Sequence, residues 1–294
     1  MNALRRIVVG LAFLVAMQGA SAAQAQLALG RTFDLRSEDY SLWSLFGTAL
    51  YQESEIPGYT SRVLILTGPQ QSDAAAAAFS SYQPVVDLNQ PFTVYFYFFM
   101  APGQVLSGDG MTFIMTSSAP ALGVGGSDLG YGGSGLDGFA FGIDTFSFGD
   151  EVQAPSIQIL ANGSSTPVAA VPTGLPSLMD PTFFTWVATV SYEPSGNEDE
   201  TGTLTGRLDQ AEGELVFTVS APVDWSSTGQ AVFDPTTEQY VGRKLRFGFS
   251  AGTGLADDGH FVLALTPAPE PGLAAMLLVG TAFLGSIARR RPRA

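Results

Sequence analysis

The sequence predicts an all-β protein: a jelly-roll β-sandwich with a hydrophobic segment at each end of the chain. Two observations predict this fold class. Helical periodicity is nearly absent from the central part of the 294-residue chain. Short runs rich in β-branched and aromatic residues recur there, each bounded by Gly, Pro, Asn, Asp or Ser. Because the chain has no cysteine, a hydrophobic core rather than disulfide bonds has to stabilise the domain.

Nine runs have the length and composition of β-strands. The run at 92–100 is apolar on both faces, which predicts a strand between two layers. The run at 183–193 alternates, so that Trp186, Ala188 and Val190 face one side of a sheet. The nine runs are residues 62–67, 92–100, 111–116, 138–146, 156–160, 183–193, 202–209, 244–251 and 260–266. Many strands separated by turn residues are typical of a sandwich or a jelly roll.

Three stretches between these runs need a separate interpretation. Residues 73–79 favour a helix by propensity, but the stretch is too short for one, and we expect a loop or a single turn. Residues 123–138 are rich in glycine and form either a flexible connector or a loop whose backbone N–H groups approach a ligand. Residues 195–202 are acidic and are predicted to form a solvent-exposed hairpin loop.

The N-terminal residues 1–25 are predicted to be a secretory signal peptide. Arg5 and Arg6 are followed by the apolar run 7–17, and Ala23-Gln24-Ala25 fits the cleavage pattern of small residues. An N-terminal membrane anchor is the alternative. The domain itself is therefore expected over residues 26–266.

The C-terminal residues 267–294 have three parts in a fixed order. Pro269-Glu270-Pro271 comes first, then the apolar run 273–288, predicted to be a helix, and then an arginine-rich end that favours the cytoplasmic side of a membrane. This order resembles the PEP-CTERM sorting signal of Gram-negative bacteria. The resemblance implies export through the inner membrane, transient anchoring by the helix, and processing by an exosortase-type enzyme. The protein would then reach the cell surface or an extracellular polysaccharide matrix; an ordinary membrane anchor is the alternative.

The charge of the domain excludes two classes of partner. The two ends contain six of the 13 basic residues but one of the 27 acidic residues, which leaves 7 basic and 26 acidic residues, or a net charge of −19, between them. Such a charge repels nucleic acid and anionic membranes, and no basic stripe interrupts it. It favours cations, calcium among them.

Five motifs along the chain carry a second resemblance. The strongest is LRFGFSAGTGLADDGHFVLALT at 245–266, and it is preceded by GDGMTFIMT at 108–116, FGIDTF at 141–146, WVATVSYE at 186–193 and GTLTGRLD at 202–209. In this order they resemble the L-type (legume-like) lectin domain. The resemblance implies a concanavalin-like sandwich that binds a polysaccharide or another glycan without catalysis.

The same resemblance implies a carbohydrate site around Asp109. The carboxylate of Asp109 would accept hydrogen bonds from two adjacent sugar hydroxyls, and the Gly108–Asp109 peptide would be cis. Backbone donors would come from the glycine-rich stretch near Gly126, and an aromatic ring from Tyr131, Phe146 or Phe148 would stack on the sugar. The predicted carbohydrate-binding residues are Asp109, Gly126, Phe146, Phe148, Leu255, Ala256 and Asp257.

Two departures from the family pattern concern metal ions. Gly142 stands where the resemblance predicts a metal-binding Glu, and Phe148 stands where it predicts an Asn that contacts both calcium and sugar. A manganese site is therefore not expected. A calcium site remains open, with Asp144, the main-chain carbonyl of Phe146 and Asp150 as its ligands, although calcium takes six to eight oxygens.

Catalysis is not expected. A glycosidase needs two carboxylates on either side of the cleaved bond, and the stretch around Asp144 keeps only one acid of the Glu-x-Asp-x-x-Glu pattern of similar-looking β-glucanases. His260 is the only histidine, and it is predicted to lie at a strand edge. The sequence thus predicts a carbohydrate-binding protein, with a structural matrix protein that uses the same fold as a scaffold as the alternative.

Overall fold

The structure is a computed structural model that describes residues 31–267, apart from 57–58, 104–107, 180–184, 198, 211–214, 230 and 237. The predicted signal peptide lies outside the described residues, as does the predicted C-terminal helix at 273–288. Within the described part, no helix has both the length and the apolar character needed to cross a membrane.

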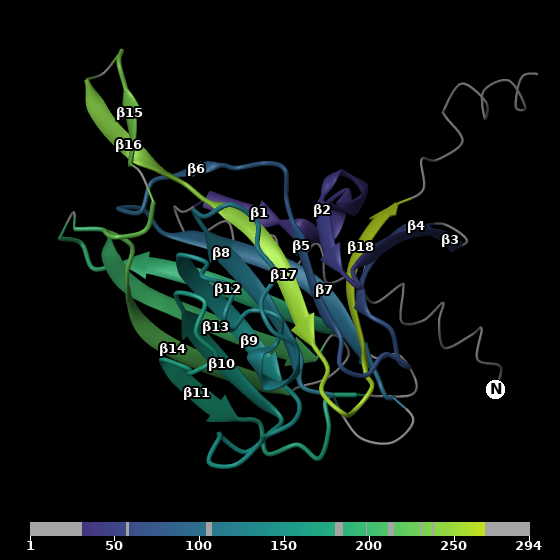
Figure 1. Cartoon of the computed structure of the whole chain (residues 1–294). Coiled ribbons are helices and arrows are strands. Elements are labelled where there is room, and N and C mark those ends of the chain that lie inside the picture. The colour runs from purple at the N-terminus through teal and green to yellow at the C-terminus, as the bar shows by residue number, and fades with distance from the viewer. Residues whose placement is uncertain are drawn as a thin grey trace, which may run out of the picture.

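Two antiparallel sheets pack face to face, with one parallel strand added at the edge of β7 (Figure 1). The 8-stranded sheet contains, in spatial order, β14 (Val216–Asp224), β13 (Thr201–Gln210), β12 (Trp186–Pro194), β7 (Phe92–Ala101), β18 (Gly259–Pro267), β4 (Tyr59–Thr67) and β3 (Leu50–Ile56), and β1 (Arg31–Asp34) pairs with β7. The 7-stranded sheet contains β11 (Ala169–Pro172), β10 (Ser156–Ala161), β9 (Gly138–Asp144), β8 (Gly110–Thr116), β17 (Arg246–Gly252), β5 (Ala75–Phe79) and β2 (Ser44–Gly47). The predicted all-β sandwich is confirmed.

A smaller sheet and three short helices complete the described chain. The small sheet consists of β15 (Ala231–Asp234), β16 (Gln239–Lys244) and β6 (Val85–Val86), and its β15–β16 hairpin projects away from the sandwich (Figure 1). The 3-10 helices are η1 (Leu35–Ser37), η2 (Tyr40–Leu42) and η3 (Gly126–Asp128). Each of the nine predicted strand runs overlaps an observed strand.

The core between the two sheets is aromatic. Phe96 comes from the 8-stranded sheet, and its ring centroid lies 5.2 Å from Phe113 and 5.0 Å from Phe249 of the 7-stranded sheet. All three side chains are fully buried. Rings at these separations contribute beyond their buried area, so this cluster joins the two layers.

Residues 73–79 were expected to form a loop or a single turn, and this prediction is wrong. β5 is a strand between β17 and β2, and the side chains of Ala76, Ala77 and Ala78 are fully buried. Ala76 and Ala78 face the core between the sheets, whereas Ala77 faces the outer side of the 7-stranded sheet. Burial on both faces overrides the helix propensity of alanine.

The glycine-rich stretch is a packed cover rather than a flexible connector. Its residues Leu129, Tyr131 and Leu136 are buried on the outer face of the 7-stranded sheet, that is, the face turned away from the 8-stranded sheet. A Cβ on Gly130 would lie 2.5 Å from the carbonyl oxygen of Ala251, so only glycine permits this approach. Tyr131 accepts a hydrogen bond from the backbone N–H of Gly163 at 3.0 Å and has no exposed ring for a sugar.

His260 does not lie at a strand edge, so that prediction is wrong. β18 runs between β7 and β4, and the imidazole points inward with no exposed surface. Its Nδ1 lies 2.6 Å from Oγ1 of Thr67, which also donates to the carbonyl of Asp258 at 2.8 Å. Because the Thr67 hydroxyl has one proton, Nδ1 of His260 then donates to it, and Nε2 is buried without a partner among the described residues.

Candidate functional site

Asp109 lies immediately before β8, at one end of the 7-stranded sheet. Its carbonyl accepts a hydrogen bond of 2.9 Å from the backbone N–H of Thr145, and the register of β8 and β9 sets Gly110 opposite Asp144. Asp109 is therefore paired with Thr145 and lies diagonal to Asp144, close enough for the charge of Asp109 to act on Asp144. The side chain of Asp109 is 7% exposed, so it is a buried carboxyl group at the surface end of a strand.

The carboxylate of Asp109 faces the loop between β17 and β18. A Cβ on Gly254 would lie 3.0 Å from Oδ2 of Asp109, so a residue without a side chain allows this close contact. Burial raises the pKa of Asp109, a backbone hydrogen bond from Gly254 partly opposes this shift, and the charge of Glu151 adds to it. The result is a desolvated acceptor next to a backbone donor.

The Gly108–Asp109 peptide is trans, so the predicted cis bond is wrong; the cis peptide among the described residues is Ala154–Pro155. Both backbone polar groups of Gly108 are hydrogen bonded. Its N–H donates to Oδ2 of Asp258, and its carbonyl accepts from the hydroxyl of Thr145. Trans is the ordinary isomer, since a cis peptide outside proline costs about 3 kcal/mol.

Asp258 supports this turn from the β17–β18 loop. It is fully buried, and its Oδ1 accepts a hydrogen bond of 3.1 Å from the backbone N–H of Gly103 in addition to the bond from Gly108. Burial raises the pKa of Asp258 to about 7, the two backbone donors lower it, and the charges of Asp257 and Asp109 raise it further. Asp258 directly follows the predicted contact residues 255–257, but its role as the anchor of a distant turn depends on the tertiary fold.

Asp144, at the end of β9, is the second buried carboxyl group of the site. Its Oδ1 accepts from the backbone N–H of Phe146 at 3.0 Å, and its Oδ2 accepts from Nε2 of Gln158 at 2.8 Å. Burial raises the pKa of Asp144 to about 7, these two donors lower it, and the charges of Glu151 and Asp109 raise it. Sequence reasoning did not find Gln158, because its link to Asp144 crosses from one strand to the next.

An exposed apolar rim surrounds these buried carboxyl groups. Leu255, next to Gly254, is 94% exposed, and Phe146 and Phe148 in the β9–β10 loop are 38% and 72% exposed. The Phe148 N–H donates to Oε2 of Glu151 at 2.6 Å, which orients the loop. Large apolar side chains of this exposure are available to a ligand.

The other predicted contacts have more limited roles in the structure. The N–H of Gly126 donates to the carbonyl of Thr253 at 3.3 Å, so this donor is engaged within the protein. Ala256 is buried, and Asp257 packs against Gly103, where any side chain would collide with it. Gly126 and Ala256 therefore shape the site by leaving space and by packing.

The proposed calcium ligands do not form a metal centre in the described part of the chain. Asp144 is buried with both oxygens hydrogen bonded, whereas Asp150 is exposed at the loop surface. No group of three or more His, Cys, Asp or Glu residues that could hold a metal ion occurs among the described residues. Glu151, rather than Asp150, is the loop acid whose charge acts on Asp144 and Asp109.

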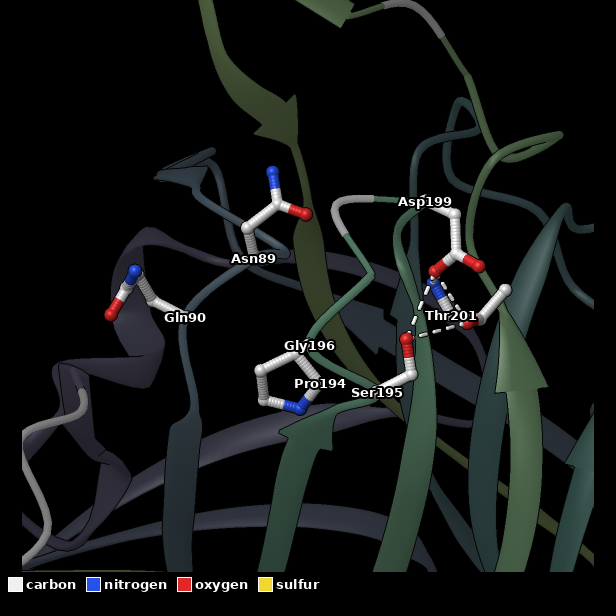
Figure 2. A pocket seen from close by; sticks show the side chains of 7 residues that line it. All are labelled: Asn89, Gln90, Pro194, Ser195, Gly196, Asp199 and Thr201. Carbon is white, nitrogen blue, oxygen red and sulfur yellow. Dashed lines mark hydrogen bonds between the residues drawn. The ribbon is translucent and has the colours of Figure 1, made fainter.

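A polar pocket of about 190 Å³ lies elsewhere, between the β6–β7 loop and the β12–β13 hairpin (Figure 2). Asp199 accepts hydrogen bonds there from the N–H of Thr201 at 3.0 Å and the hydroxyl of Ser195 at 3.1 Å. Asn89 and Gln90 stand on the other side of the pocket (Figure 2). They precede β7, whose ten residues span about 30 Å. Gly103, which contacts Asp258 of the Asp109 site, follows the other end of β7, so the pocket and the site are separate.

Neither a protein-family model nor a curated protein matches the sequence. Solved structures do match. The winged bean acidic lectin, in complex with methyl-α-D-galactose, aligns with a TM-score of 0.55 and 20% identity over 78% of this chain and 95% of that chain. The Lotus tetragonolobus seed lectin aligns with a TM-score of 0.56 and 18% identity over 80% and 97% of the two chains. The exoplasmic/lumenal domain of VIP36, in a form bound to Ca²⁺ and Man3GlcNAc, aligns with a TM-score of 0.51 and 18% identity over 80% and 89%.

At 18–20% identity, these similarities establish a shared fold. The described sandwich is the fold of L-type lectins, as the motif order predicted. Function depends on the site that a particular chain builds on its fold, so the next step rests on the residues around Asp109.

Proposed function

We propose that this chain is a non-catalytic carbohydrate-binding protein whose site centres on Asp109. The observation that carries the proposal is a carboxylate, 7% exposed, held between a strand end and Gly254 and surrounded by exposed apolar side chains. A carboxylate offers two acceptor oxygens, which suits two neighbouring hydroxyl groups of a sugar. Hydrogen bonds to a charged acceptor in such a desolvated place are stronger than those in water.

The apolar rim supplies the second half of sugar recognition. A pyranose ring has an apolar face of C–H groups, and Phe146, Phe148 and Leu255 present apolar surface beside the carboxylate. Leu255 is 94% exposed and therefore gains the most from being covered. The sugar-bound state of the lectins that share this fold supports the same kind of ligand for this chain.

Calcium does not fit the residues of this site. A calcium ion binds carboxylate oxygens at 2.3–2.6 Å, and N–H donors of Phe146 and Gln158 already point at both oxygens of Asp144. Gly142 adds no ligand. We therefore propose sugar binding without calcium or manganese, in contrast to the VIP36 structure, which was solved with Ca²⁺.

We also propose a location and a route to it. The predicted signal peptide at 1–25 and the sorting signal at 267–294 support export and processing by an exosortase-type enzyme. The glycan partner would then be a polysaccharide of the cell surface or of the surrounding matrix. Nucleic acid is not a partner in this proposal because the domain is strongly acidic.

A glycan array tests the proposal directly. The purified protein is expected to bind a defined group of glycans, and Asp109→Asn is expected to weaken binding at least about tenfold, since one acceptor oxygen becomes a donor. Asp87→Asn is the matched control, because Asp87 is an exposed turn residue before β7. Absence of binding above background by folded wild-type protein would overturn the proposal.

A structural matrix protein is the second candidate. The low exposure of Asp109 favours it, because a ligand has to reach a carboxylate that is only 7% exposed. In that case the sandwich serves as a stable scaffold at the cell surface. Unchanged association of Asp109→Asn with the matrix, together with an unresponsive glycan array, would favour the scaffold.

A further inference from the structure

Gln158 occupies a position that strand register makes available. It lies on β10 directly opposite Gly142 of β9, and the next pair on the same face is Ser156 opposite Asp144. The Gln158 side chain runs diagonally from this position toward Asp144, and a Cβ on Gly142 would meet Cβ of Gln158 at an ordinary 3.5 Å. The Gln158 amide thereby reaches Asp144 at 2.8 Å and the hydroxyl of Ser156 at 3.1 Å.

The amide of Gln158 and the backbone of Phe146 together occupy the carboxylate of Asp144. One N–H points at Oδ1 and the other at Oδ2, with distances of 3.0 and 2.8 Å. Asp144 is 5% exposed and Gln158 is also 5% exposed, so few water molecules can replace either donor. Two N–H donors do for a buried carboxylate what a cation does: they stabilise its charge and fix its direction.

The fixed carboxylate in turn orients the rim. Asp144 holds the N–H of Phe146, and the following Phe148 carries the most exposed aromatic ring of the site. Each donor takes one lone pair of its oxygen and directs a positive N–H at the carboxylate, so a cation at Asp144 would have to compete with both donors. The hydrogen bonds of the Gln158 amide go to Asp144 and Ser156, so its route to the rim is through Asp144.

We propose that Gln158 is a positioning residue that replaces a divalent cation, so that the loop carrying Phe146 and Phe148 is ordered without metal. The proposal extends the proposed function to the way in which the site is held. Its tests measure loop order and metal binding, not sugar binding. A failed glycan array would therefore contradict the proposed function but not this inference. Failure of the tests on loop order or metal binding would contradict this inference but not the proposed function.

The first experiment compares backbone amide exchange in three full-length proteins: wild type, Gln158→Met and Gln52→Met. Methionine has the length of glutamine but no donor, and Gln52 is an exposed glutamine on the edge strand β3. In Gln158→Met, amides of residues 145–149 are expected to exchange about tenfold faster, with exchange in β17 unchanged. Gln52→Met is expected to match the wild type. Unchanged exchange at 145–149, or a uniform increase over the whole domain, would overturn the positioning role.

The second experiment needs no variant, so it remains decisive even if Gln158→Met fails to fold. Wild-type protein stripped of metal is titrated with calcium chloride up to about millimolar concentration, the weak end of extracellular calcium sites. No saturable heat is expected, and amide exchange at 145–149 is expected to be equal in calcium and in chelator. Binding to the acidic surface that leaves this exchange unchanged agrees with the proposal. Saturable binding that slows exchange at 145–149 would overturn it.

Discussion

Oδ2 of Asp109 lies so close to Gly254 that a Cβ at position 254 would be 3.0 Å from the oxygen. Any residue other than glycine would therefore force an adjustment. The two residues belong to different strand ends, β8 and β17, that pair across the 7-stranded sheet. Their contact sets the position of the carboxylate on which sugar binding is proposed to depend.

Gly254→Ala should therefore weaken glycan binding while preserving the fold. The added methyl group displaces the carboxylate by a few tenths of an ångström, and we expect an affinity loss of roughly fivefold, or about 1 kcal/mol. Calorimetry with the best glycan from the array measures this loss. Gly68→Ala is the control, because a Cβ there meets its nearest neighbour, a Gln71 side-chain atom, at an ordinary 3.5 Å. Equal affinity of the two variants would contradict the role of the contact.

Asp258 predicts a dependence of stability on pH. Its pKa of about 7 in the folded state is above the value of 3.8 for an unperturbed carboxyl group. A raised folded-state pKa favours the folded protein below the unfolded pKa, and this stability is lost as pH rises from about 4 to about 7. Asp258→Asn should remove part of this loss, which is at most about 1.4 kcal/mol per pH unit. Urea unfolding at several pH values gives the slope of the free energy of unfolding against pH. This slope does not depend on a loss of stability that is the same at every pH.

His260 should have the opposite effect. Burial lowers its pKa from 6.5 to about 3, so the folded state keeps the imidazole neutral while the unfolded chain takes up a proton. The stability associated with the neutral ring is therefore lost as pH falls from about 6.5 toward 3. Relative to wild type, His260→Leu should gain stability progressively over that window, measured by the same urea series. A constant difference between the two proteins at every pH would contradict this prediction.

Arg243 is a nearly buried cation, and it should be more costly to remove than an exposed one. It pairs with Glu200 at 2.7 Å and donates to the carbonyls of Ser226, Thr228 and Gly229. The arginine side chain is only 9% exposed, so Arg243→Ala leaves a carboxylate and three carbonyls without their donor and should cost about 3–5 kcal/mol. Arg207→Ala breaks a comparably short pair with Asp209, but that arginine is 51% exposed and should cost less than about 1 kcal/mol. Thermal unfolding of both variants tests the contrast.

The strands that sequence could predict are those whose pattern agrees with their surroundings. β7 was predicted because Phe96 and Phe98 fill the core on one face, while the aromatic residues on its other face are buried or half-buried. β5 was not predicted, because its alanines pack against the glycine-rich stretch, and this contact exists only in the folded protein. β14 carries Pro222, which weakens a strand pattern, and the structure accommodates it because β14 is an edge strand.

The site shows the same division. Asp109 stands out in the sequence because two glycines flank it before an apolar run. Gln158 has no such signal, since its position next to Asp144 arises from the strand register that sets it opposite Gly142. Asp258 has none either, because its hydrogen-bond partner Gly108 is 150 residues away in the chain. Local spacing therefore singled out Asp109, whereas the groups that hold it depend on tertiary structure.

The order of strands has a consequence for how the chain reaches this state. β17 and β18 are the last two strands of the domain, yet β17 lies between β8 and β5, and β18 lies between β7 and β4. Until residues 246–267 are available, each sheet is split at its middle and exposes two strand edges where a partner belongs. The two sheets therefore cannot form strand by strand from the N-terminus. A chain that ends before β17 lacks a central strand of each sheet.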